Sequence, residues 1–226
     1  MLSKVSVVIP CLNTERTIGS TVLLAKQYSD RVVVVNDGSR DNTRSVAEMA
    51  GAFILDNGSN KGYGASILAG LEEVQYISDV VVTLDGDGQH DPKGIPSLIL
   101  PILEGIADVV IGSRLLKNQS SIPFYRRIGI RIITFAYNLG AKSRLTDAQS
   151  GLRAYSGKAF LLLLEGSKEL GSGMDFSVYS LILLRKSGLR FFEVPVSCSY
   201  IKDSTYNAIV HGLFVAIATL WGRIRR

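Results

Sequence analysis

The chain has 226 residues, a formal net charge of +5, and a composition of 46% hydrophobic and 20% charged residues. This composition supplies a large core and excludes a disordered chain. Two cysteines, Cys11 and Cys198, are too few for a disulfide framework, so we expect a reducing, cytoplasmic setting. No run of about 18 apolar residues predicts a membrane span, and the first residues predict no signal peptide.

The basic net charge favours anionic partners such as phosphates, lipid headgroups or nucleic acid. Nucleic-acid surfaces usually interleave aromatic and basic side chains, and this pattern is absent from the sequence. We therefore expect a small phosphate-bearing ligand or a membrane surface, and no nucleic acid.

Strand and helix patterns alternate along the first half of the chain. Short β-branched runs predict strands at residues 5–10, 31–36, 52–55, 80–84 and 108–111. Helical spacing predicts helices that begin near residues 18 and 44, and helices at residues 65–76 and 93–104. Such alternation is typical of an α/β fold with a Rossmann-like, mostly parallel central sheet flanked by helices.

The second half is less regular. We predict helices at residues 124–139, 157–164 and 175–186, and strands at 152–155 and 190–196. Pro195 indicates that the last of these strands lies at a sheet edge. Apolar residues at helical spacing then predict a C-terminal amphipathic helix. The expected organisation is one domain over residues 1–205, followed by a separate helix over residues 206–226.

The stretch VVVTLDGDGQHDP, residues 80–92, organises the chain. Its apolar first half predicts a buried strand that ends at Asp85 and Asp87, and ligands of open α/β sheets bind outside the carboxyl ends of the strands. Two carboxylates one residue apart can hold a hard divalent cation, and the small residue Gly86 lets a ligand approach the backbone. The alternative is an ordinary turn after a strand.

Other polar segments also follow predicted strands. Asp37 lies after the second strand, where it can contact a ligand or cap the following helix. A glycine-rich loop that ends at Gly64 precedes the next helix. Asp147 can serve catalysis or brace its loop through hydrogen bonds.

Two segments bear on membrane contact. The helix at residues 124–139 carries Arg127 and Arg131 beside an apolar stripe, which indicates phosphate or membrane contact or a solvated face. The tail at residues 206–226 ends in arginines and has a wide apolar side. It can lie at a membrane interface or pack as the last core helix, and we favour the interface.

Six stretches resemble, in order, those of the family-2 glycosyltransferases with the GT-A fold. Within that family the resemblance is to the polyprenyl-phosphate sugar synthases, which include the dolichol-phosphate mannose synthases. The matching stretches cover roughly residues 5 to 200 and read PCLNTERTIG, VVVVNDGSRDNT, NKGYGASILAG, LDGDGQHDP, IGSR and DAQSGLRAYS.

The resemblance implies roles for individual residues. The nucleoside of a nucleotide sugar is expected at Pro10, Leu12, Asn13, Asn36 and Asp37, with Gly64 and Gly86 beside the donor. A Mg²⁺ or Mn²⁺ ion on the diphosphate is expected at Asp85, Asp87 and Gln89. Arg114 is expected to face the sugar and the acceptor phosphate, and Arg127, Arg131 and Lys202 are further candidate phosphate ligands. The candidate catalytic residues are Asp87, Arg114 and Asp147.

The chain also departs from the family pattern. Leu12, Asn13 and Thr14 stand where the family usually has Tyr-Asn-Glu, which removes a ring and a carboxylate that could touch the nucleoside. Asn36 replaces the first of a common Asp-Asp pair. YIKDSTYN stands in place of the Arg-x-x-Gly-x-Ser-Lys of typical mannose synthases, so Lys202 is a substitute cation.

The resemblance implies an inverting transfer of a hexose, from a donor of the GDP-mannose or UDP-glucose type, to a polyprenyl (dolichyl) phosphate. A phosphate monoester is already anionic at neutral pH, since its second pKa is about 6, so this acceptor needs no strong general base. A saccharide hydroxyl would need one, and Asp147 or Asp175 would be the candidate.

Three functions therefore stay open at this point: the polyprenyl-phosphate transferase, a soluble transferase acting on a saccharide hydroxyl, and a sugar-nucleotide-binding subunit without turnover. For the first we expect a peripheral protein on the cytosolic face of a membrane, with a membrane-anchoring partner subunit or a second copy of the chain as an expected partner.

Overall fold

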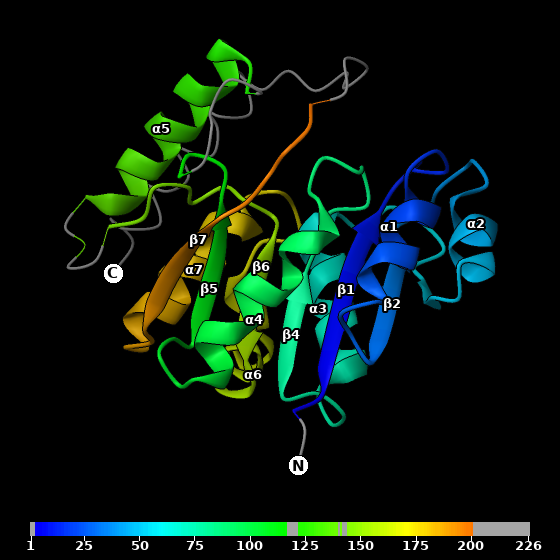
Figure 1. Cartoon of the computed structure of the whole chain (residues 1–226), viewed down its shortest axis with the longest axis horizontal. Coiled ribbons are helices and arrows are strands. Elements are labelled where there is room, and N and C mark those ends of the chain that lie inside the picture. The colour runs from blue at the N-terminus through cyan, green and yellow to red at the C-terminus, as the bar shows by residue number, and fades with distance from the viewer. Residues whose placement is uncertain (1–2, 117–121, 140, 142–143, 201–226) are drawn as a thin grey trace.

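The computed structural model describes residues 3–116, 122–139, 141 and 144–200. In this part of the chain seven strands form one sheet, in the order β3-β2-β1-β4-β6-β5-β7 (Figure 1). The strands are β1 (Val5–Cys11), β2 (Arg31–Asn36), β3 (Phe53–Asp56), β4 (Val80–Thr83), β5 (Val109–Ser113), β6 (Arg153–Ser156) and β7 (Phe191–Pro195). The predicted mostly parallel sheet is confirmed, and Pro195 lies on an edge strand.

Valine-rich strands suit a sheet that is covered on both faces. Successive residues of a strand point to opposite faces, so Val7 and Ile9 of β1 belong to one core and Val8 to the other. The first core also receives α1 (Ile18–Ala25), α2 (Thr43–Met49) and α4 (Ile95–Leu103); the second receives α3 (Tyr63–Val74), α6 (Gly157–Glu165) and α7 (Phe176–Lys186). The sheet is therefore the middle of three layers.

Helix α3 begins two residues earlier than its predicted start at residue 65. The backbone N–H groups of Gly64 and Ala65 donate to the Ser172 carbonyl oxygen at 2.7 and 3.2 Å, which satisfies the first turn from a distant loop. Gly62 precedes the helix with a φ of +99°, a conformation that L side chains rarely adopt. Tertiary contact therefore sets this helix start.

Strand β6 is the antiparallel member of the sheet, paired with both β4 and β5. Two parallel strands that follow each other in the chain need a crossover connection, which carries the chain from the end of the first strand back to the side of the sheet where that strand began. After β5 the chain instead forms α5 (Phe124–Asn138), which lies outside the sheet layers (Figure 1), and re-enters the sheet in the opposite direction. The segment before β6 consequently lies at the edge where β1, β4 and β5 end.

Helix α5 has apolar side chains on two faces. Its inner face buries Ile130, Ile133, Thr134, Ala136 and Tyr137. What we call the outer face of α5 consists of the exposed residues Phe124, Tyr125, Ile128, Ile132, Phe135 and Leu139. The apolar stripe that the sequence predicts beside Arg127 and Arg131 consists of Ile128, Ile132 and Phe135. It is thus exposed, and Phe135 keeps 67% of its accessible surface.

Two predictions fall outside the described residues: the C-terminal helix at residues 206–226 and the cation Lys202. Among the residues that the structure does describe, none forms a helix long and apolar enough to cross a membrane.

Candidate active site

A pocket of about 450 Å³ opens at the carboxyl ends of β1, β4 and β5. We call it the main pocket. Loops after these strands, the start of α3, one side of α5 and the segments before β6 and α7 contribute its walls. Its lining residues are Pro10, Cys11, Leu12, Thr14, Tyr63, Asp85, Gly86, Asp87, Gln89, Arg114, Arg126, Gly129, Ile130, Gln149, Met174 and Tyr200.

Asp85 lies deepest on the acidic wall of the main pocket. Its carboxylate packs against Gly151, where any side chain would overlap it, and it accepts a hydrogen bond from the Tyr63 hydroxyl. Its Oδ1 atom is buried and has no hydrogen-bond partner among the described residues. Removal from water, and the nearby charge of Asp87, raise the pKa of Asp85 to about 6.

Asp87 lies nearer to solvent on the same wall. Its Oδ1 atom accepts a hydrogen bond of 3.0 Å from the Gln89 backbone N–H, which closes a turn in which Gly88 has a φ of +72°. Desolvation raises the pKa of Asp87. The hydrogen bond from Gln89 and the positive charges of Arg126 and Arg114 lower this pKa, but by less. Two carboxylates with raised pKa values indicate a wall that a cation would stabilise.

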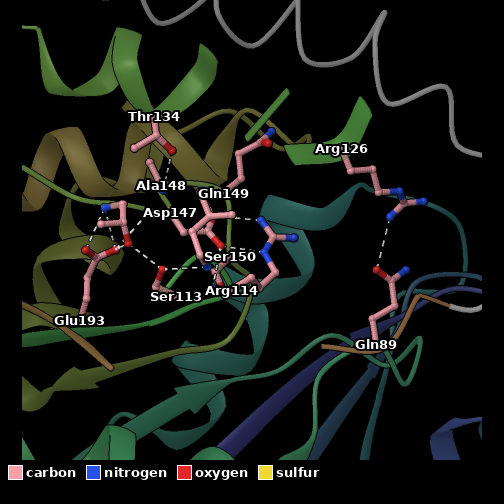
Figure 2. Close-up of polar contacts among 12 residues, drawn as sticks. Gln89, Ser113, Arg114, Arg126, Thr134, Asp147, Ala148, Gln149, Ser150 and Glu193 are labelled. Carbon is pink, nitrogen blue, oxygen red and sulfur yellow. Dashed lines mark hydrogen bonds and ion pairs between the residues drawn. The ribbon is translucent and has the colours of Figure 1, made fainter. Parts of the chain in front are cut away.

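Arg114 also lines the main pocket, on what we call its basic wall, and is held by Asp147 (Figure 2). Its Nε and Nη2 atoms donate to the two carboxylate oxygens at 2.7 and 2.9 Å, and its backbone N–H donates at 3.2 Å. The Arg114 Nη1 atom donates to the Tyr200 hydroxyl at 3.3 Å. This forked geometry fixes the plane of the guanidinium.

Asp147 is fully buried and does not line the main pocket. Burial alone would raise its pKa, but the charge and hydrogen bonds of Arg114 outweigh burial and lower it. The side chain therefore braces Arg114 and is poorly suited to accept a proton.

Arg126 is a pocket residue that the sequence-based assignments omit. Its Nη1 atom donates to the Gln89 Oε1 atom at 3.4 Å (Figure 2). Its guanidinium lies 4.7 Å from the centre of the Tyr200 ring. Arg126 shares the inner side of α5 with Ile130 and Ile133, at positions i, i+4 and i+7. The signal was present in this spacing, but the more apolar outer stripe obscured it.

Arg127 and Arg131 do not line the main pocket. Arg127 is half-buried beside the Phe124 ring, and Arg131 is exposed. Asp175, the other candidate base, is half-buried next to Gly171 and also stays outside the pocket lining. Arg127 and Arg131 consequently lie away from Asp85 and Asp87, whereas Arg114 and Arg126 line the same pocket as these two carboxylates.

A second pocket of about 740 Å³ adjoins the first at Leu12. The predicted nucleoside residues Leu12, Asn13 and Asn36 line it, together with the loops after β2 and β3. Asn13 has a φ of 53°, and its side chain accepts a hydrogen bond of 2.9 Å from the Arg40 backbone N–H. The two pockets therefore meet at Leu12, and their lining residues extend from the end of β3 to α5.

Asp37 is buried and belongs to neither pocket lining. Its carboxylate accepts hydrogen bonds from the backbone N–H groups of Lys61 and Gly62, at 2.8 and 3.0 Å, and from the Asn57 side chain at 2.8 Å. It therefore holds the glycine-rich loop. The start of α2 is instead bonded by Asp41, whose Oδ1 atom accepts from the Thr43 N–H at 3.0 Å.

Glycines allow the close packing on which the pockets depend. Gly64 is buried, and a side chain there would overlap the Gly171 carbonyl and Phe176. Gly86 packs over Cys11 at the end of β1, so that a Cβ at residue 86 would lie 3.0 Å from the Cys11 Cβ atom. Gly86 lines the main pocket, where a ligand can approach the backbone, whereas Gly64 lies outside both pocket linings and serves the packing of α3.

The donor set of the acidic wall fits a hard divalent cation when a substrate completes it. The described residues contain no group of three or more His, Cys, Asp or Glu side chains that could hold a metal by themselves. Asp85 has an unpartnered buried oxygen, and Asp87 and Gln89 add oxygen atoms in the same pocket. Few protein ligands plus phosphate oxygens are typical of Mg²⁺ sites.

Similar proteins identify the family. A family model described as glycosyl transferase family 2 matches residues 6–163. An uncharacterized protein of Methanocaldococcus jannaschii is 34% identical, over 89% of this chain and 84% of its own length. The UDP-N-acetylglucosamine–dolichyl-phosphate N-acetylglucosaminyltransferase of Methanococcus voltae is 29% identical, over 87% and 86%. The undecaprenyl-phosphate 4-deoxy-4-formamido-L-arabinose transferase of Pseudomonas fluorescens is 36% identical, over 67% and 46%.

Among solved structures, the fold is similar to that of glucosyl-3-phosphoglycerate synthase from Mycobacterium tuberculosis in complex with Mn²⁺, UDP and phosphoglyceric acid. The TM-score is 0.74 at 22% identity, and the match covers 98% of this chain and 78% of that one. This likeness confirms the predicted GT-A fold. With its family match over residues 6–163, its glycosyltransferase relatives and this fold, the chain belongs to glycosyl transferase family 2.

Proposed function

We propose that the chain transfers a hexose from a nucleotide sugar to a polyprenyl phosphate at a membrane surface, with inversion at the anomeric carbon. The observation that carries this proposal is the presence, in one pocket, of two carboxylates with raised pKa values and of two arginines, Arg114 and Arg126. The relatives named for dolichyl-phosphate and undecaprenyl-phosphate acceptors support it.

The donor is proposed to span both pockets. Its nucleoside occupies the second pocket beside Asn13 and Asn36, and its diphosphate reaches the acidic wall past Leu12, which lines both. The M. voltae relative is named for a UDP-sugar, so UDP-sugars come first among the donors to test and GDP-mannose second.

Asp85, Asp87 and Gln89 are the residues that would hold Mg²⁺ or Mn²⁺ on the diphosphate. When bound, such an ion acts as a Lewis acid for the negative charge that develops on the leaving phosphate. The two carboxylates also disfavour an uncompensated negative ligand, so a diphosphate requires the cation in order to approach them.

The acceptor phosphate is proposed to bind Arg114 and Arg126. One phosphate oxygen attacks the anomeric carbon as the bond from that carbon to the diphosphate breaks, and the electron pair leaves on the nucleoside diphosphate. The phosphate is already ionised at neutral pH, so no proton has to be removed. This suits a site in which Asp147 is committed to Arg114.

The outer face of α5 is proposed to rest on the cytosolic surface of the bilayer. Its exposed aromatic and aliphatic side chains suit the interface, and Arg127 and Arg131 can contact anionic headgroups. Arg126 on the same helix lines the main pocket, so this placement brings a lipid phosphate to the arginines without a long path through water.

The test is a transfer assay in which radiolabel enters the organic phase. The protein is incubated with Mg²⁺ or Mn²⁺, a short-chain polyprenyl phosphate and a panel of labelled UDP- and GDP-sugars. We expect label in the lipid fraction with one donor, and its loss with chelator or with Asp87→Ala.

A variant at one arginine of the main pocket makes the assay specific for the acceptor site. Arg126→Ala should raise the KM for lipid phosphate, and Lys168→Ala, an exposed change outside both pockets, serves as the control. Transfer to a saccharide hydroxyl in place of the lipid, or metal-dependent nucleotide binding with no transfer to any lipid phosphate, would overturn the proposal.

A further inference from the structure

Glu193 of the edge strand β7 makes a set of contacts that neither the motifs nor the comparisons assign. Its Oε1 and Oε2 atoms accept hydrogen bonds from the Thr146 backbone N–H at 3.0 and 2.8 Å. Oε1 also accepts from the Asp147 backbone N–H at 3.1 Å and from the Thr146 hydroxyl at 3.1 Å (Figure 2). One carboxylate therefore holds two consecutive amides at the point where the chain turns toward Asp147.

The same turn is bonded from two further directions. The hydroxyls of Thr146 and Ser113 lie 2.6 Å apart, and Ser113 directly precedes Arg114. The Ala148 backbone N–H donates to the Thr134 hydroxyl of α5 at 3.0 Å in a buried contact (Figure 2). Three successive residues, 146 to 148, are thus held by side chains from β7, β5 and α5.

This bonding explains how the Arg114 fork can be rigid although Asp147 lies on a loop. A bidentate ion pair is specific only if both planes are fixed, and the Asp147 plane depends on its backbone. The Glu193 carboxylate accepts from both amides and from the Thr146 hydroxyl with its two oxygens, whereas a glutamine amide could offer only one oxygen.

We propose that Glu193 is a positioning residue for Arg114: it fixes the backbone of Thr146 and Asp147 so that Asp147 holds the guanidinium toward the acceptor. The inference deepens the proposed function, because it gives the acceptor site a support on the strand farthest from the donor pocket. Burial raises the pKa of Glu193, which agrees with a carboxylate kept half-buried for its contacts.

The experiment compares Glu193→Gln and Glu193→Asp with Asp108→Asn. Asp108 is a matched control because its carboxylate also binds a backbone N–H group, that of Arg190 at 2.9 Å, but it does so next to the first residues of β5 and β7, away from Thr146 and Asp147. We expect Glu193→Gln to raise the KM for lipid phosphate about tenfold, with donor binding unchanged. Asp108→Asn should leave both unchanged.

A second readout does not depend on turnover. Arginine side-chain ¹⁵N NMR on the free protein detects the Arg114 Nε–H group, assigned by its loss in Arg114→Lys. We expect slow solvent exchange in the wild type and in Asp108→Asn, and exchange at least about tenfold faster in Glu193→Gln, because the bonds from residue 193 to the backbone of Thr146 and Asp147 weaken.

The outcomes separate the two proposals. If the wild type transfers no sugar to lipid phosphate, the proposed function fails, but the exchange rates still decide the role of Glu193. Wild-type exchange at Arg114 in a folded Glu193→Gln or Glu193→Asp variant would overturn the positioning role. So would equal effects of Glu193→Gln and Asp108→Asn on the lipid-phosphate KM, because a merely structural carboxylate would act in that way.

Discussion

The two walls of the main pocket use carboxylates in opposite ways. On the acidic wall, Asp85 keeps a buried oxygen without a partner, and its pKa is raised. Behind the basic wall, Asp147 is fully buried but accepts four hydrogen bonds from Arg114 and Gln149, and its pKa is lowered. The comparison teaches that burial alone does not identify a functional acid, because its partners decide whether it binds a ligand or holds a neighbour.

The largest expected effect on activity comes from a substitution on the acidic wall. Asp87→Asn should lower kcat/KM about a thousandfold, because the variant loses a ligand for the cation that stabilises the leaving diphosphate. Its stability toward urea should not fall, since a desolvated charge is removed. Asp91→Asn is the control, because Asp91 closes a similar turn by accepting from the Lys93 N–H but lies outside the pocket. Equal losses in both variants would contradict a direct role for Asp87.

The next prediction concerns stability and the buried partner of Arg114. Asp147→Asn should lower the free energy of unfolding at pH 7 by about 3 kcal/mol, because it leaves the Arg114 charge without its buried partner. The Asp147 pKa is lowered in the folded state, so this stabilisation is present above the ordinary pKa of 3.8 and is lost as the pH falls below it.

Urea unfolding between pH 7 and pH 3 measures this difference. The gap between wild type and Asp147→Asn should narrow as the pH falls below 3.8. Asp108→Asn, which removes an ion pair with the exposed Arg190, should cost at most about 1 kcal/mol. A constant gap at all pH values would show that the loss comes from packing and not from charge.

A third prediction concerns how the Asp85 carboxyl changes stability with pH, in the absence and in the presence of a divalent metal. Its folded pKa of about 6 lies above the ordinary 3.8, so between these values the folded state holds a proton that the unfolded state has lost. Without metal, the wild type should therefore lose about 1 to 3 kcal/mol relative to Asp85→Asn as the pH rises from 4 to 7.

Saturating Mn²⁺ with UDP should remove most of that difference at pH 7, because the bound cation favours the ionised carboxylate. Thermal unfolding of both proteins at pH 4 and pH 7, with and without Mn²⁺ and UDP, gives the measurement. If the stability difference between wild type and Asp85→Asn is the same at both pH values, folding does not raise the pKa of Asp85, and the pKa values of Asp85 and Asp147 differ less than we infer.

The smallest effect distinguishes the two sides of α5. Arg126→Ala should raise the KM for a short-chain lipid phosphate about tenfold, since one charged contact to the phosphate is lost. Arg127→Ala should leave that KM unchanged in detergent but weaken binding to anionic vesicles by about 1 kcal/mol. Vesicle sedimentation and the transfer assay measure the two quantities. The reverse result would place Arg127 in the acceptor site, as the sequence alone suggests.

Local patterns predicted the elements of the sheet well. The β-branched runs before Asp85 and Arg114 form β4 and β5, and the acidic pair does lie at a carboxyl edge. What the patterns could not provide was the direction of β6, because a four-residue strand reads the same in either direction. That direction depends on where α5 leaves the chain.

The site was predictable only in part, for the same physical reason. Arg126 and Arg127 are neighbours in sequence, and only the burial of Ile130 and Ile133 shows which arginine faces the pocket. Glu193 lies 46 residues from Asp147, and no spacing rule links an edge strand to that turn. The roles assigned to the metal and nucleoside residues stay predictions.

The antiparallel insertion of β6 has an evolutionary consequence. The chain leaves the sheet at the carboxyl end of β5 and re-enters it as the antiparallel strand β6 at the same end. The segment between Arg114 and Leu152 is therefore not a crossover connection between parallel strands. Such a segment can be lengthened or exchanged without reordering the sheet. Because this segment carries α5 and Asp147, it holds most of the proposed acceptor site, and we expect that grafting it from a relative would change the acceptor while leaving the proposed donor site in place.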